Sequence, residues 1–71
     1  MYLVMEIQVF EDGKTSTPTY AYDNRNSAEA KYHAILSGAS VSELPKHSAV
    51  MLTEEGYYIK SECFEHQKEG E

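Results

Sequence analysis

The stretch Asn26–Gly38, which reads NSAEAKYHAILSG, has the clearest helical pattern in the chain, and the other predicted elements flank it on both sides. Its apolar residues recur at the spacing that places side chains on one face of a helix. These stripe residues, continued just past the stretch, are Ala28, Tyr32, Ile35, Leu36 and Ala39. Asn26 as N-cap and Glu29 three residues later fit a capping box. The sequence therefore predicts a helix over about Ser27–Ser37 that buries this stripe.

The end of this helix is defined less sharply than its start. Gly38 fits a C-cap, because glycine tolerates the left-handed backbone that often closes a helix. Residues 39–44 can also extend the helix or form a second turn, and Pro45 ends any such extension. Both endings are compatible with the sequence.

Upstream of the helix, residues 2–10 alternate with a period of two, which indicates a strand. One face carries Leu3, Met5, Ile7 and Val9, and the other carries Tyr2, Val4, Glu6, Gln8 and Phe10. Because the first face is purely apolar, we expect it to pack on the helix. Asp12-Gly13 then forms a turn, and a second strand follows over roughly Thr15–Tyr22. Pro18 places that strand at a sheet edge or breaks it, since proline cannot donate to a ladder.

Downstream of the helix, a second pair of strands is predicted over Ser48–Thr53 and Tyr57–Phe64, joined by a turn at Glu54–Gly56. The prediction is an α+β, two-layer domain of residues 1–66, with a charged C-terminal tail at 67–71. Its four-stranded, mainly antiparallel sheet has the order β-β-α-β-β, with one helix packed on one face. The expected core is Leu3, Met5, Ile7, Val9, Tyr32, Ile35, Leu36, Val50 and Leu52.

The other face of the sheet is expected to carry Tyr2, Val4, Phe10 and one of Tyr57 and Tyr58. Such an aromatic surface is compatible with ordinary exposed tyrosines and equally with burial in a dimer.

The composition narrows the possible partners. A chain of 71 residues with one cysteine has a marginal core and no internal disulfide, so we expect a homo-oligomer. Twelve acidic residues against six Lys and Arg give a net charge of −6, which argues against a DNA or RNA polymer but not against a small anion. No run approaches the ~20 apolar residues of a membrane span. With no signal-peptide pattern at its start, the expected location is cytoplasmic, away from membranes.

The histidines His33, His47 and His66 are the candidates for chemistry. Two histidines on facing elements could act as acid and base in a metal-independent phosphodiesterase. The alternative is that neither histidine has a chemical role, with His33 a solvated helix residue and His47 a loop residue. Glu29 and His33 lie one helical turn apart, but no third metal ligand is evident. Cys63 has acidic neighbours, which suit packing better than nucleophilic reactivity. We therefore predict no catalytic residue, no metal and no cofactor.

A ligand site is predicted where basic and aromatic residues gather near the helix ends. The expected anion contacts are Arg25, Lys31, His33 and His47, with Tyr22 or Tyr32 stacking on a base ring. Arg25 is favoured because it lies beside the helix N-terminus, where free backbone N–H groups attract anions.

Several short segments carry a resemblance: residues 21–26, Ala28-Glu29, Lys31–His33 and residues 47–50. With these segments the chain resembles short uncharacterised proteins of phages and prophages of Gram-positive bacteria. The resemblance implies a setting in which small non-enzymatic proteins sequester nucleotide immune signals, join the virion or block host proteins. The expected function is a sponge, meaning an anti-defence protein that binds and sequesters a small anionic ligand without catalysis. The alternatives are a protein–protein interaction module and the metal-independent phosphodiesterase.

Overall fold

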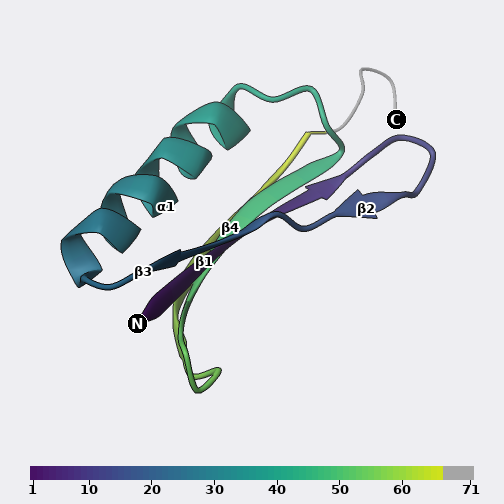
Figure 1. Ribbon diagram of the computed structural model, residues 1–71. Coiled ribbons are helices and arrows are strands. Elements are labelled where there is room, and N and C mark those ends of the chain that lie inside the picture. The colour runs from purple at the N-terminus through teal and green to yellow at the C-terminus, as the bar shows by residue number, and fades with distance from the viewer. Residues whose placement is uncertain (67–71) are drawn as a thin grey trace.

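The computed structural model describes residues 1–66, and the predicted tail at 67–71 lies outside the described residues. One helix packs on one face of an antiparallel sheet, so the α+β prediction is confirmed (Figure 1). The elements are β1 (Tyr2–Val9), β2 (Thr15–Ser16), β3 (Thr19–Tyr22), α1 (Arg25–Ser40), β4 (Lys46–Thr53) and β5 (Tyr58–Glu65).

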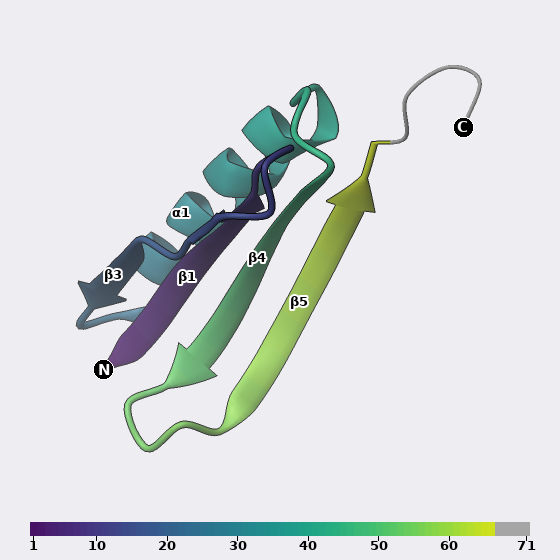
Figure 2. The same ribbon diagram turned by 90° about the vertical axis from the view of Figure 1, so that its right-hand side faces the viewer.

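The sheet has five strands where four were predicted, because the second predicted strand is divided in two. Both β2 and β3 pair with β1 along one edge, and β4 and β5 follow on the other side of β1 (Figure 2). Pro18 lies in the gap between β2 and β3, and its carbonyl accepts a hydrogen bond from the Glu6 N–H at 2.9 Å. Proline has no N–H to donate in return, so the ladder breaks there.

Helix α1 begins and ends at positions other than those predicted. Asn24, not Asn26, is the N-cap: its backbone is extended and its side-chain oxygen accepts from the Ser27 N–H at 2.8 Å. Gly38 lies inside the helix, which continues to Ser40 and is capped by Val41. The buried stripe contains Ala28, Tyr32, Ile35 and Ala39 as predicted, whereas the predicted member Leu36 is only partly buried beside it. Thus the face of the helix follows from the spacing of apolar residues, whereas its ends depend on local backbone conformation.

Both predicted turns are present, and both depend on glycine. Gly13 and Gly56 have φ angles of 89° and 93°, a region that residues with a Cβ rarely adopt. In the first turn the Asp12 carboxylate also accepts from the Lys14 N–H at 2.9 Å. These turns fix the antiparallel register of the strands that they join.

The core lies between α1 and the sheet face opposite to the one predicted. Its buried members are Val4, Ala28, Tyr32, Ile35, Ala49 and Met51, with Tyr2, Tyr20, Tyr22, Leu36 and Ile59 packed around them. Val4 is fully buried, so β1 turns its Val4 side toward the helix. The prediction that Leu3, Met5, Ile7 and Val9 pack on the helix is therefore wrong. The expected core positions of Val50 and Leu52, and the placement of Tyr2 and Val4 away from the helix, are wrong for the same reason. Alternation could not decide between the faces, because β1 and β4 carry apolar residues on both.

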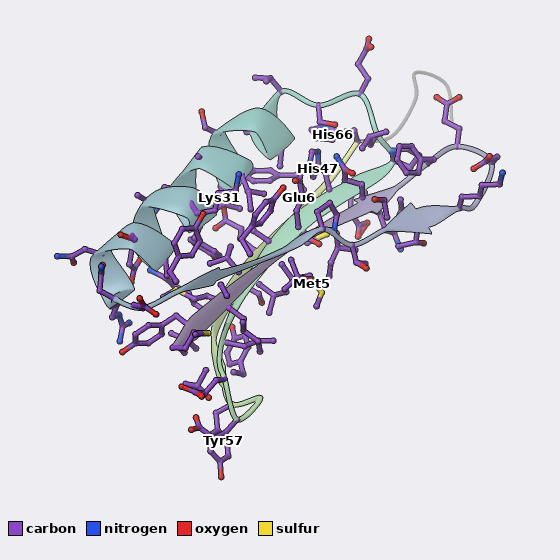
Figure 3. All side chains as sticks on the ribbon, in the orientation of Figure 1. Met5, Glu6, Lys31, His47, Tyr57 and His66 are labelled. Atoms are coloured by element: carbon purple, nitrogen blue, oxygen red, sulfur yellow. The ribbon has the colours of Figure 1, made fainter. Side chains whose placement is uncertain are left out.

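The face turned away from α1 is called the open face here. Its aliphatic members are Leu3, Met5, Ile7 and Val9 of β1 and Val50 and Leu52 of β4. The register places Leu3 opposite Leu52 and Met5 opposite Val50, so these side chains lie together. Figure 3 shows Met5 pointing away from the helix. Cys63 lies opposite Ser48 and is exposed, which corrects the expectation that it packs in the core.

Candidate functional site

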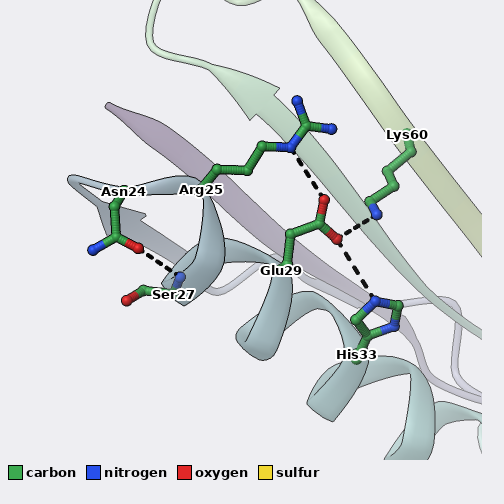
Figure 4. A network of polar contacts seen from close by, with 6 residues as sticks. All are labelled: Asn24, Arg25, Ser27, Glu29, His33 and Lys60. Atoms are coloured by element: carbon green, nitrogen blue, oxygen red, sulfur yellow. Dashed lines mark hydrogen bonds and ion pairs between the residues drawn. The ribbon is translucent and has the colours of Figure 1, made fainter.

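Two of the predicted anion contacts meet around one carboxylate on α1. Arg25, Glu29 and His33 are four residues apart in turn, a spacing that puts them on one face of a helix. The Arg25 Nε donates to Glu29 Oε2 at 3.2 Å, and the His33 Nε2 lies 3.6 Å from Glu29 Oε1. Lys60, which comes from β5, donates to the same Oε1 atom (Figure 4). These four residues are called the Glu29 cluster.

The position of Lys60 follows from the sheet. Lys60 is paired with Met51 on the helix-facing side of β5, next to a register shift at Met51 and Leu52. From there its ammonium group lies 5.1 Å from the centre of the Tyr32 ring, within the range of a cation–π contact. Burial in turn raises the pKa of the Tyr32 hydroxyl, and the nearby Glu62 carboxylate adds to this shift.

The Glu29 cluster carries more positive than negative charge. Arg25 and Lys60 are two permanent cations around one carboxylate, and the His33 ring lies beside the same carboxylate. The hydrogen bond from Lys60 lowers the pKa of the Glu29 carboxyl, Arg25 lowers it further, and desolvation opposes both. Glu29 therefore stays ionised at neutral pH and holds the surrounding cations near one another.

The cations of this cluster face solvent. The side chains of Arg25 and His33 are 55% and 67% exposed, and that of Lys60 is 35% exposed. Figure 4 shows the contact of Arg25 with Glu29 at Nε only, with both terminal guanidinium nitrogens pointing elsewhere. The arrangement leaves donors of a fixed geometry available at the surface.

The other predicted contacts lie apart from this cluster. Lys31 is two residues from both Glu29 and His33, and its ammonium sits 4.1 Å from the centre of the Tyr20 ring. Tyr32 is only 4% exposed, so its ring is a core element in this structure and not an open stacking surface. Tyr22 is half-buried at the edge of the core.

His47 belongs to a separate, buried pair under the C-terminal half of the helix (Figure 3). It is 7% exposed, and its Nε2 lies 2.5 Å from Glu6 Oε2, which also accepts from the Gln8 side chain at 3.2 Å. Its Nδ1 is buried without a hydrogen-bond partner in residues 1–66. His66 contacts the Ala39 carbonyl at 2.9 Å. Each of the three histidines thus has a different partner, and His33 and His47 do not face a shared site.

The sequence predicted Arg25 and His33 as parts of a ligand site, but it did not predict Glu29 and Lys60 as parts of one. The four-residue spacing of Arg25, Glu29 and His33 was a usable signal, because it predicts a common helix face. Lys60 is 31 residues from Glu29 in the chain. Lys60 reaches the helix only because β5 pairs with β4. This pairing cannot be predicted from the residues near Lys60 in the sequence.

Among residues 1–66, no group of three or more His, Cys, Asp and Glu side chains is placed to hold a metal ion. The helix of the described region does not have the length and apolar character that crossing a membrane requires. Comparisons with protein-family models, curated proteins and solved structures found no match to this chain.

Proposed function

We propose that this protein binds a small anionic ligand at the Glu29 cluster and holds it without chemical conversion. The observation that supports this function is the meeting of Arg25, His33 and Lys60 around one carboxylate in a protein of net charge −6. On such an acidic chain, a local excess of positive charge selects for a small anion and against a long polyanion.

The donors of the cluster suit a phosphate group. A guanidinium can bind phosphate through two parallel hydrogen bonds, and Arg25 still has both terminal nitrogens for this purpose. Arg25 is also the first residue of α1, so the partial positive charge of the helix N-terminus adds to its own. The phage resemblance makes a nucleotide immune signal the specific ligand to test.

The placement of the histidines favours binding over catalysis. An acid–base pair for phosphodiester cleavage needs both groups within hydrogen-bond reach of the same phosphate. His33 lies on Glu29 at the surface, whereas His47 is buried against Glu6. The protein in this conformation therefore offers a phosphate one histidine, not two.

Calorimetry tests this function with inorganic phosphate, cyclic dinucleotides and cyclic ADP-ribose isomers as probes. The wild-type protein should bind at least one of these probes, and chromatography of the heated complex should return it unchanged. Arg25→Ala should weaken binding by about 10- to 150-fold, the range of a hydrogen bond to a charged group. Lys14→Ala is the matched control, because Lys14 is an exposed cation in the turn between β1 and β2.

Three results would contradict the proposal. They are the absence of binding to every probe, an equal effect of Arg25→Ala and Lys14→Ala, and recovery of a cleaved probe. The last of these results would favour the phosphodiesterase alternative.

A further inference from the structure

The two faces of the sheet have the reverse of the usual polarity. Along β1 and β4, the face covered by α1 carries Glu6, Gln8 and His47, and its only large aliphatic or thioether side chains are Val4 and Met51. The open face carries Leu3, Met5, Ile7, Val9, Val50 and Leu52 along the same two strands, with Lys46 and Ser48 as its polar residues at the start of β4. The side without a covering layer is therefore the more apolar one.

This distribution does not suit a solvated face. An antiparallel sheet that has one face in water normally alternates apolar and polar residues, with the polar ones outward. The buried cluster under the helix has six members, and Ala28 and Ala49 are two of them. Such a small core contributes little hydrophobic stabilisation, and most of the large aliphatic side chains of the sheet lie outside it. A second layer over the open face would supply the missing burial.

We propose that the second layer is another copy of this chain, packed open face to open face about a two-fold axis. The resulting order of layers is helix, sheet, sheet, helix. Paired sheets of this kind stack about 10 Å apart with their strands at about −30°. An isologous interface requires a surface that complements itself, and aliphatic side chains can meet their own copies without matched polar partners.

The size of the open face agrees with a stable dimer. Strands β1, β4 and β5 each have eight residues. At about 3.4 Å per residue and 4.8 Å between strands, four strand positions make a face of roughly 27 by 19 Å, or about 500 Å². Two such faces bury about 1,000 Å², which is the lower limit for a specific interface.

The charges at the border of the open face also permit two identical copies to meet. Lys46 and Glu65 are opposite each other in the β4–β5 register, so this corner of the face carries both signs. A second copy carries the same lysine and glutamate at its own border. Lys46 of one copy can therefore lie near Glu65 of the other, and like charges need not meet. The outer edge of β5 is the competing contact, since its backbone groups are unpaired in residues 1–66. The experiment below separates the two.

Sedimentation velocity of the full chain over about 1–300 µM tests the proposal, since this range spans the affinities typical of weak to moderate dimers. The wild type should sediment at twice the chain mass of 8.1 kDa. Val50→Lys places a charge at the centre of the open face and should weaken the dimer by more than about 100-fold. Val41→Lys is the matched control, because Val41 is 81% exposed at the end of α1 and away from the sheet. This control should remain dimeric.

Circular dichroism verifies that each variant is folded. Val50→Thr keeps the branched shape and serves as a milder second variant, with an expected weakening of about tenfold. A wild type that is folded and monomeric at all concentrations overturns the proposal. A folded Val50→Lys that stays dimeric also overturns it and places the contact at an edge of the sheet. In this dimer the helices lie outermost, so Val50→Lys should leave anion binding at the Glu29 cluster unchanged.

Discussion

Two carboxylates of this protein each lie beside a histidine, Glu29 beside His33 and Glu6 beside His47, but in very different surroundings. The Glu29 pair is at the surface and is joined by Arg25 and Lys60. The Glu6 pair lies under the helix, where the carboxylate also accepts a hydrogen bond from the amide of Gln8. The two carboxylates are similarly half-buried, with 24% and 18% of the Glu29 and Glu6 side chains exposed, whereas His33 is exposed and His47 is buried.

The comparison shows that surroundings, not residue types, decide which pair can act. Around Glu29, additional cations and solvent exposure leave charge available for a ligand. Around Glu6, the hydrogen-bond partners of the carboxylate are the side chains of His47 and Gln8, and the His47 ring is shielded from solvent. We therefore regard the Glu6–His47 pair as part of the fold and the Glu29 cluster as the proposed binding site.

The largest expected effect concerns stability and the buried pair. Glu6→Ala removes the partner of His47 Nε2, so the ring is left with two unsatisfied nitrogens in the core. The free energy of unfolding should fall by about 1–3 kcal/mol, the cost of a buried polar group without a partner. Urea denaturation followed by circular dichroism measures this change.

His33→Ala is the matched variant at the surface, and its effect on the free energy of unfolding should stay within about 0.5 kcal/mol. Equal losses in Glu6→Ala and His33→Ala would show that the two pairs do not differ as the structure indicates.

The same contrast explains how much could be predicted from the sequence. Local sequence patterns predicted the position of the helix, both turns and the break at Pro18, because these features depend on residues that are neighbours in the chain. The face of β1 that meets the helix was predicted wrongly, because Leu3 and Val4 are both apolar and a shift by one residue exchanges the faces. Glu6 was therefore predicted to lie away from the helix, when in fact it is the half-buried partner of the buried His47. Ion pairs that cross between elements, such as Glu29 with Lys60, depend on the completed sheet and have no local signature.

The next effect in size concerns ligand affinity and the exposed cluster. Lys60→Gln removes one of the two permanent cations near Glu29, and it should weaken binding of the phosphate probe by up to about fivefold, the range of an exposed ion pair. Calorimetry at constant ionic strength gives the affinity. Lys46→Gln removes an exposed cation at the other end of the same sheet and should leave the affinity unchanged. An effect of Lys46→Gln as large as that of Lys60→Gln would indicate attraction by total charge and not by the cluster.

The smallest expected effect is a dependence of stability on pH that comes from Glu29. The hydrogen bond from Lys60 lowers the pKa of this carboxyl below its ordinary value of 4.5. A group whose pKa is lowered in the folded state stabilises the fold above its unfolded pKa and loses that contribution as the pH falls through the folded pKa. Wild type and Glu29→Gln should therefore differ in urea midpoint near neutral pH, and this difference should shrink below pH 4.5.

The control for this pH series is Glu43→Gln, because Glu43 is an exposed carboxylate in the connection between α1 and β4. Near neutral pH, its difference from the wild type should be smaller than that of Glu29→Gln. A difference between wild type and Glu29→Gln that grows on acidification would mean that the surrounding cations do not stabilise the Glu29 carboxylate. In that case the Glu29 cluster would not hold its cations together, and the contrast with the buried pair would lose its electrostatic basis.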